Sequence, residues 1–496
     1  MAGRGDGTGK RRRAAPAHER ATGPRTLGDG GATAEAGDPA GARPPYGRRR
    51  IVVGLVLLAV LVVAGGAVAL VTSHHPAKPP APAAIQPSAA QRAAERELAR
   101  ETKAVAEATS RVSLDYPTVA GQPAPLWTAH AFDAPLPSHV VLGFVPYYAL
   151  GELTPADYAD VSTIAYDGVE LTSGGGFDEQ STDLGWQALH SPAFATLVTD
   201  AHEDKDQVLL TVFTETQSVI SAITAHPASA GKRLADQIQP VLADDRLDGV
   251  DVDVEGSGKS ERPGFVSFMR AFTTELRDTD PSAVIVLDTY PGSADDPQSF
   301  FDVAALAPLV DTMFVMAYDM YQPGRASPNA PLASPVLGLS DVQTLLQYTA
   351  VVKPSELLLG IPFYGYDFVT RSSAPGAATT HAAPEAVTWQ SIQAAGHQAL
   401  WDPQSDTPWY GFKMKKQWHE TYFDDPASIA LKTALAAEMH LQGVGVWALG
   451  MESGDDSMLQ ALLGGAKPRK LPLTASAVLS INKRPGSGAG ALARTT

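Results

Sequence analysis

Eight short runs of aliphatic and β-branched residues alternate with longer helix-like stretches between residues 138 and 464. Strands that are separated by helices pair in parallel, because a parallel neighbour is reached only through a crossover connection. Eight such units predict a (β/α)8 TIM barrel, and the 327 residues leave room for an insertion. The predicted strands are His139–Pro146, Val161–Tyr166, Gln207–Phe213, Leu247–Glu255, Ala283–Thr289, Asp311–Tyr318, Leu357–Pro362 and Gly443–Leu449.

The helices and the insertion follow from the same alternation. Asp425 and Pro426 are typical of a helix N-cap and first helical position, so a helix is predicted to start there. Residues Tyr364–Asp425 are too many for a loop and predict an α+β insertion after the seventh strand. The predicted helices are Pro192–Lys205, Ala228–Ala243, Gly264–Arg277, Ser340–Val352 and Pro426–Leu441.

Composition limits the chemistry. The chain has no cysteine, which excludes disulfides, thiolate metal sites and cysteine nucleophiles. Its net charge of −16 divides into +6 over residues 1–50, −28 over the central 414 residues and +6 over residues 465–496. A central region with this much negative charge repels polynucleotides. We therefore expect a neutral or cationic ligand and no nucleic-acid partner.

The N-terminal region predicts a membrane anchor. Residues 1–50 are rich in Gly, Ala, Arg and Pro and predict a disordered basic tail, with nucleic-acid binding as the alternative. Ile51–Val71 is a run of 21 uncharged, mostly aliphatic residues, long enough for a transmembrane helix. Arg48–Arg50 precede it directly, so we expect a cytoplasmic N-terminus and an extracellular catalytic domain. A cleaved signal peptide is the alternative.

The remaining segments predict a linker and a tail. Residues 72–137 begin with a Pro/Ala-rich spacer, and residues 91–111 within them predict a solvated stalk helix. Residues 465–496 are again rich in small residues and predict a disordered basic tail. The predicted barrel lies between these two segments, at residues 138–464.

The stretch from Leu247 to Gly256 is the strongest functional signal in the sequence. Side chains alternate along a strand, so Asp251, Asp253 and Glu255 share one face and three valines share the other. Three carboxyl groups in a semi-enclosed site repel one another, which raises the pKa of at least one of them. A carboxyl group that holds its proton near neutral pH can act as a general acid. The alternatives to a catalytic role are a strand with one solvent-exposed face and a binding site for a hard cation.

Four motifs, in chain order, resemble glycoside hydrolase family 18, the chitinase-like family. Asp248–Glu255 resembles its D-G-x-D-x-D-x-E signature, and Met316–Asp319 resembles the M-x-Y-D of its sixth strand. Leu359–Gly365 resembles the G-I-P-x-Y-G of its seventh strand, and Gly443–Trp447 its closing strand, which ends in Trp. The resemblance covers residues 139–463 and implies a TIM barrel that hydrolyses β-linked N-acetylhexosamine glycans.

The resemblance also implies four catalytic residues. In this family the carbonyl oxygen of the substrate's own 2-acetamido group attacks the anomeric carbon, with net retention and without a cofactor or metal. Glu255 would protonate the glycosidic oxygen and later activate water. Asp253 would hold the acetamido N–H and balance positive charge, Asp251 would share a proton with Asp253, and Tyr318 would hydrogen-bond the acetamido group.

The same resemblance implies substrate-binding residues. Trp447 would form the floor of a sugar subsite by stacking, with plain core packing as its alternative. Asp319 would bind sugar hydroxyls or brace its loop, and Tyr147 and Tyr364 would line the same cleft. The expected partner is therefore a glycan that contains N-acetylhexosamine.

One departure bears on the substrate. Many chitinases carry S-x-G-G after the third strand, where this chain has Leu210–Glu215. The first strand and Trp447–Gly450 resemble bacterial members that cut cell-wall or spore-cortex glycan, which favours chitin-like oligosaccharides or peptidoglycan over crystalline chitin. Two other functions stay open: a glycan-binding protein without turnover, and a metal-dependent enzyme on the same barrel.

Overall fold

The computed structural model describes residues 96, 99–101, 103–108, 110–111, 134–177, 179, 183–334, 339–380 and 383–472. The predicted basic tail at 1–50, the predicted transmembrane helix at 51–71 and residues 473–496 lie outside this set. Among the described residues, no helix has the length and apolar character needed to cross a bilayer. The membrane anchor therefore stays a prediction.

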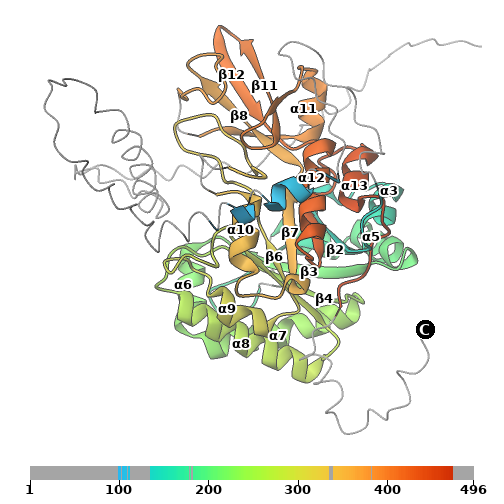
Figure 1. The fold of residues 1–496 in the computed structure, drawn as a ribbon. Coiled ribbons are helices and arrows are strands. Elements are labelled where there is room, and N and C mark those ends of the chain that lie inside the picture. The colour runs from blue at the N-terminus through green and yellow to red at the C-terminus, as the bar shows by residue number, and fades with distance from the viewer. Residues whose placement is uncertain are drawn as a thin grey trace, which may run out of the picture. The chain divides into compact units, whose positions relative to one another are not determined.

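The eight predicted strands form a closed barrel, which confirms the predicted TIM barrel (Figure 1). Every neighbouring pair in this barrel is parallel. The order around the barrel is β1, β13, β7, β6, β5, β4, β3, β2. The strands are β1 (Val140–Pro146), β2 (Thr163–Glu170), β3 (Gln207–Thr214), β4 (Gly249–Val254), β5 (Val284–Thr289), β6 (Thr312–Val315), β7 (Leu357–Pro362) and β13 (Gly443–Trp447).

Aromatic packing fills one side of the barrel interior. The ring of Phe314 on β6 lies 5.0 Å from that of Phe144 on β1, centroid to centroid. Two glycines make room for it, because a Cβ atom at Gly360 or Gly445 would lie 2.7 Å from a ring carbon of Phe314. Such a contact is too short for any side chain, so β7 and β13 need glycine at these positions.

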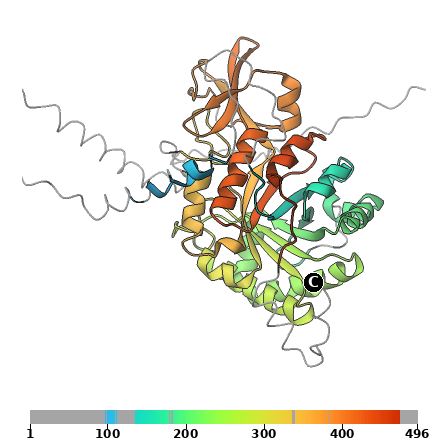
Figure 2. The same cartoon turned by 45° about the vertical axis from the view of Figure 1, so that its right-hand side comes forward.

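Helices cover the outside of the barrel (Figures 1 and 2). The N-cap predicted at Asp425 is confirmed, since its carboxylate accepts from the amides of Ala427 and Ser428. The helices are α3 (Pro155–Asp160), α4 (Leu184–Leu189), α5 (Pro192–Glu203), α6 (Gln217–Ala225), α7 (Pro227–Asp244), α8 (Arg262–Thr279), α9 (Val303–Leu306), α10 (Asp341–Tyr348), α12 (Pro426–Glu438) and α13 (Asp456–Leu463), with short 3-10 turns η2 (Tyr147–Ala149), η3 (Ala307–Leu309) and η4 (Pro354–Glu356).

The predicted α+β insertion follows β7. It is a five-stranded antiparallel sheet in the order β10, β11, β12, β8, β9, with one helix. Both views show β8, β11, β12 and α11 together beyond one end of the barrel (Figures 1 and 2). Its elements are β8 (Tyr364–Thr370), β9 (Glu385–Thr388), α11 (Trp389–Ala395), β10 (Leu400–Asp402), β11 (Thr407–Met414) and β12 (Gln417–Tyr422).

Two segments next to the barrel are less solvated than the sequence predicts. Residues 103–108 are helical as expected, but Ala104 and Ala108 are buried and Arg111 pairs with Glu438 of α12 at 2.7 Å. At the other end, Leu471 is buried and its amide donates to the side chain of Gln207. Small apolar side chains within these charged, low-complexity segments bury enough surface to pack them against the barrel.

Candidate active site

Seven of the eight predicted site residues lie at or just beyond the carboxyl ends of barrel strands, and Asp251 lies within its strand. Asp251 and Asp253 are on β4, and Trp447 is the last residue of β13. The others follow directly: Tyr147 after β1, Glu255 after β4, Tyr318 and Asp319 after β6, and Tyr364 two residues after β7. A parallel barrel brings these strand ends to a single face, which is where TIM-barrel enzymes place their active sites.

The carboxylate ladder, defined here as Asp251, Asp253 and Glu255, is built by β4 as predicted. Val250, Val252 and Val254 are fully buried on the opposite face of the strand. Asp251 is also fully buried, whereas Asp253 and Glu255 are partly accessible. The two outer carboxyl groups are therefore more accessible than Asp251 and better placed to meet a substrate.

Burial and mutual repulsion keep protons on this ladder. Burial raises the pKa of Glu255 to about 7, with a further contribution from the charge of Glu215. Burial also raises the pKa of Asp253 well above its usual range, and the charges of Glu255 and Asp251 act in the same direction. The pKa of Asp251 is likewise raised by burial, to about 7. Near neutral pH the ladder thus contains groups that can both give and take a proton.

The loop after β6 brings aromatic side chains to the ladder. Residues 316–318 leave the sheet earlier than predicted, because the amides of Ala317 and Tyr318 bond to carbonyls two residues back. This turn buries Tyr318, whose pKa rises through burial and through the nearby charges of Asp288 and Asp253. Its hydroxyl therefore stays protonated and can serve as a hydrogen-bond donor at the ladder.

Asp319 connects the barrel to the insertion. Its carboxylate accepts hydrogen bonds of 2.7 Å from the hydroxyls of both Tyr364 and Tyr366 on β8. Its backbone has φ +57°, and its amide donates to Oδ1 of Asn329 at 2.7 Å. These contacts connect the loop after β6 to β8, and both roles expected for Asp319, bracing of its loop and binding of sugar hydroxyls, stay predictions.

Trp447 and Tyr147 lie at the same end of the barrel but have separate contacts. The ring of Trp447 packs against Phe144 with centroids 5.5 Å apart, and the residue stays partly accessible. The ring of Tyr147 meets Tyr148 edge-on at 5.4 Å. Both residues lie at the carboxyl end of a barrel strand, and their roles in binding stay predictions.

The structure adds residues that the sequence analysis missed. Asp288 near the end of β5 is buried beside Asp251, and the hydroxyl of Tyr290 hydrogen-bonds Glu255. Asp167 on β2 adds negative charge to the ladder, as Glu215 does after β3. An acid within or directly after an aliphatic run was the sequence signal for Asp288 and Asp167, because the strands of a parallel barrel are otherwise nearly continuous apolar runs.

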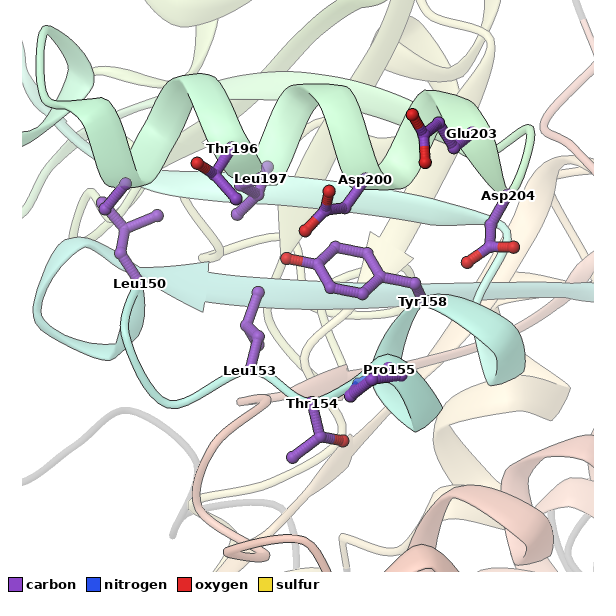
Figure 3. Close-up of a pocket in the computed structure, with 11 residues that line it drawn as sticks. Leu150, Leu153, Thr154, Pro155, Tyr158, Thr196, Leu197, Asp200, Glu203 and Asp204 are labelled. Carbon is purple, nitrogen blue, oxygen red and sulfur yellow. The ribbon is translucent and has the colours of Figure 1, made fainter.

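A separate pocket lies on the barrel wall between α3 and α5 and contains none of the predicted site residues (Figure 3). It has a volume of about 410 Å³, and the ring of Tyr158 lies between the two helices with its hydroxyl towards Asp200. Burial raises the pKa of Tyr158 to about 12, with Asp200 adding to the effect. The carboxyl ends of the strands therefore remain the candidate site for chemistry.

Comparison with known proteins identifies the family. The family model described as glycosyl hydrolases family 18 matches residues 121–452, which is more than half of the chain and includes the whole carboxylate ladder. The chain belongs to glycosyl hydrolase family 18. It is thus a glycoside hydrolase of the chitinase- and chitobiase-like type. The four motifs predicted the family and its chitinase-like character.

Three similar proteins illustrate the relationship. Di-N-acetylchitobiase of Mus musculus is 25% identical over 263 residues, covering 45% of this chain and 68% of that protein. The putative sporulation-specific glycosylase YdhD of Bacillus subtilis is 24% identical over 229 residues, covering 45% and 51%. The crystal structure of the spore cortex-lytic enzyme SleL of Bacillus megaterium shares the fold with a TM-score of 0.55 at 16% identity, covering 74% and 82%.

The described residues were also searched for side chains that could bind a metal ion. Within residues 134–472 as far as they are described, no group of three or more His, Asp or Glu side chains is arranged to hold a metal ion. The ladder is surrounded instead by hydroxyl and carboxyl groups, which are proton donors and acceptors. Such hydroxyl and carboxyl groups can serve acid–base chemistry at a glycosidic bond.

Proposed function

We propose that this protein hydrolyses β-linked N-acetylhexosamine glycans, chitin-like oligosaccharides or peptidoglycan, by a retaining, substrate-assisted mechanism. The relatives named as chitobiase and as sporulation or cortex-lytic enzymes support this substrate class. The observation that carries the proposal is the carboxylate ladder at the barrel mouth, where partial burial raises the pKa of Glu255 to about 7. A terminal carboxyl group with that pKa can deliver a proton at neutral pH and still accept one afterwards.

In the proposed reaction, Glu255, Asp253 and Tyr318 each have a separate role. Protonated Glu255 gives its proton to the glycosidic oxygen as the bond to the anomeric carbon breaks. The acetamido carbonyl oxygen of the substrate attacks the same carbon and forms an oxazolinium ion, which Asp253 stabilises by accepting from the acetamido N–H. Tyr318 donates to the acetamido oxygen and orients it. The Glu255 carboxylate then takes a proton from water, which opens the ring with retention of configuration.

We further propose that the barrel acts outside a membrane to which the chain is anchored. The uncharged run at Ile51–Val71 and the arginines directly before it support this arrangement. A Pro/Ala-rich spacer follows, which would hold the barrel away from the bilayer. Such an enzyme would meet extracellular glycan directly.

The test compares Glu255→Gln with wild type in the full-length chain purified in detergent. Glutamine keeps the shape of the side chain but cannot give or take a proton. Glu275→Gln is the matched control, because Glu275 lies on the outer helix α8 and pairs with Lys232. Each variant is incubated with N-acetylglucosamine oligomers and with peptidoglycan fragments, and mass spectrometry follows the released sugars.

We expect products from wild type and Glu275→Gln and a loss of at least about 1,000-fold for Glu255→Gln. Equal activity of Glu255→Gln would contradict the assigned role. Binding without turnover in wild type would favour the glycan-binding alternative. Loss of activity with a chelator would favour the metal-dependent one.

A further inference from the structure

Four cationic side chains gather at one end of the insertion sheet. They are called the basic tip here and are Arg371, Lys413, Lys415 and Lys416. The lysines belong to the hairpin between β11 and β12, and the arginine directly follows β8, which pairs with β12. Residues 371–380 and 407–419 contain no Asp or Glu, although the central region of the chain has a net charge of −28. The basic tip therefore reverses the sign of the charge locally.

The charges of the basic tip face solvent. All four residues are exposed, and none forms an ion pair with an acid of the described residues, whereas Lys232 and Lys432 each do. Lys413 lies over the ring of Trp418, with Nζ 5.0 Å from the ring centroid. Met414, between the lysines, is 47% exposed. The tip thus offers cations beside apolar surface to an anionic partner.

The hairpin turn holds two lysines in a backbone conformation that disfavours them. Met414 pairs with Gln417, so Lys415 and Lys416 form a two-residue loop. Their φ values are +49° and +72°. Both central residues of such a type I′ turn are usually Asn, Asp or Gly, because a Cβ atom strains this left-handed conformation. Lysine at both positions costs stability without gaining an ion pair among the described residues, which indicates a role for the two charges.

The insertion sheet connects the basic tip to the candidate active site. β8 begins at Tyr364, whose hydroxyl donates to Asp319 beyond the carboxyl end of β6, and it ends at Thr370 beside the tip. The six residue steps from 364 to 370 span roughly 20 Å, at about 3.3 Å for each step. A glycan bound at the barrel mouth must therefore extend over several sugars, or carry side chains of its own, to meet the tip.

We propose that the basic tip binds the carboxylates of peptidoglycan whose glycan strand occupies the active site. The peptide side chains of peptidoglycan carry carboxylates, whereas N-acetylglucosamine oligomers are neutral. Lysine and arginine form charge-assisted hydrogen bonds with such groups, and several contacts at one end of the sheet add to the affinity. The tip therefore favours peptidoglycan over chitin-like oligosaccharides. This inference rests on the proposed glycosidase function and narrows its substrate class.

The test measures binding of peptidoglycan fragments before and after amidation, which removes the charge of their carboxyl groups. The protein is the full-length chain in detergent with Glu255→Gln, so that the fragments stay intact. In this parent, Lys413→Gln/Lys415→Asn/Lys416→Gly is expected to weaken binding of the unmodified fragments by roughly tenfold and of the amidated fragments by less than about twofold. The difference should shrink at high salt, because ions screen exposed charges.

The turn itself provides a variant that separates charge from folding. Lys415→Asn/Lys416→Gly supplies residues that a type I′ turn prefers, so it is expected to unfold at an equal or higher urea concentration than the parent. It should nevertheless bind the unmodified fragments more weakly. Lys205→Gly is the matched control, because Lys205 is an exposed lysine with φ +73° in the turn before β3, at the amino end of the barrel. We expect it to bind both kinds of fragment as the parent does.

Three results would overturn the proposal. One is equal binding of the unmodified fragments by the triple variant and the parent, and another is the same loss for unmodified and amidated fragments. The third is weaker binding to phosphatidylglycerol vesicles with unchanged fragment binding, which would make the tip a membrane contact. Charge-dependent fragment binding by a protein that cleaves no glycan with Glu255 intact would uphold the role of the tip while the proposed function fails.

Discussion

Glu255 sets the pH dependence of the reaction at the scale of a single residue. As a general acid it must be protonated, and burial raises its pKa to about 7, so activity is expected to fall as pH rises through that value. The charge of Glu215 contributes to this pKa. Glu215→Gln removes a negative neighbour and lowers the pKa of Glu255, which moves the alkaline limb of kcat/KM to lower pH. A limb that moved to higher pH would contradict the assignment.

The buried carboxyl group of Asp206 is expected to make the free energy of unfolding depend on pH. Burial raises its folded-state pKa to about 7, so the folded protein keeps a proton that the unfolded chain releases above about pH 4. Stability is therefore lost as pH rises from about 4 to about 7. Asp206→Asn is expected to raise the free energy of unfolding at pH 8 by about 1 kcal/mol after allowance for solvent screening, with little effect at pH 4. Urea unfolding at both pH values measures this, and a destabilised variant at pH 8 would contradict it.

Single residues also show what the sequence could and could not predict. The acids of the carboxylate ladder alternate with valines, so their common face was evident from the strand period alone. Asp288 and Tyr290 belong to β5 and the residue after it, where no repeated pattern marks them. Their proximity to Asp251 and Glu255 depends on the register between β4 and β5, which local sequence does not specify.

At the scale of secondary-structure elements, a buried ion triad ties the insertion to the barrel. Lys432 of α12 lies 3.2 Å from Asp341, the first residue of α10, and 3.1 Å from Asp424 after β12. All three are buried, and the Lys432 ammonium also donates to the carbonyl of Ala330. Removal of the only cation from such a cluster leaves two uncompensated carboxyl groups.

Lys432→Met is therefore expected to lower the free energy of unfolding by about 3–5 kcal/mol. The loss should be smaller at low pH, where Asp341 and Asp424 are protonated. The triple variant Lys432→Met/Asp341→Asn/Asp424→Asn removes the charges together and is expected to recover part of the stability. Urea unfolding of the three proteins measures this, and a loss below about 1 kcal/mol in Lys432→Met would show that the triad contributes little.

The elements themselves were largely predictable, with instructive exceptions. The barrel strands were evident because both faces of a parallel strand are buried, which requires continuous apolar runs. β6 ends at Val315, although its apolar run continues to Tyr318, because local turns replace the ladder bonds there. The insertion was recognised by its length, and its individual strands were not predicted. These five antiparallel strands are short, and some pair with strands that are distant in the sequence, such as β8 with β12. Such pairings depend on tertiary packing.

At the scale of the whole molecule, the sequence predicts attachment to a membrane through residues 51–71. The full chain expressed in bacteria is expected in the membrane fraction and to resist extraction at alkaline pH. A chain that starts at residue 73 is expected in the aqueous fraction. Its glycosidase activity is the control for folding. Equal partitioning of the two chains would contradict the anchor, and a chain shortened at its N-terminus after secretion would favour the cleaved signal peptide.

The configuration of the first product tests the central mechanism most directly. Proton NMR follows the anomeric signals during the first minutes of N-acetylglucosamine oligomer hydrolysis by the full-length protein, before mutarotation equilibrates them. A matched oligomer of glucosamine, which lacks the acetamido carbonyl, is measured under the same conditions. We predict that the β-anomer forms first and that the glucosamine oligomer is not cleaved. Initial release of the α-anomer, or comparable cleavage of both oligomers, would contradict catalysis by the substrate's own acetamido group.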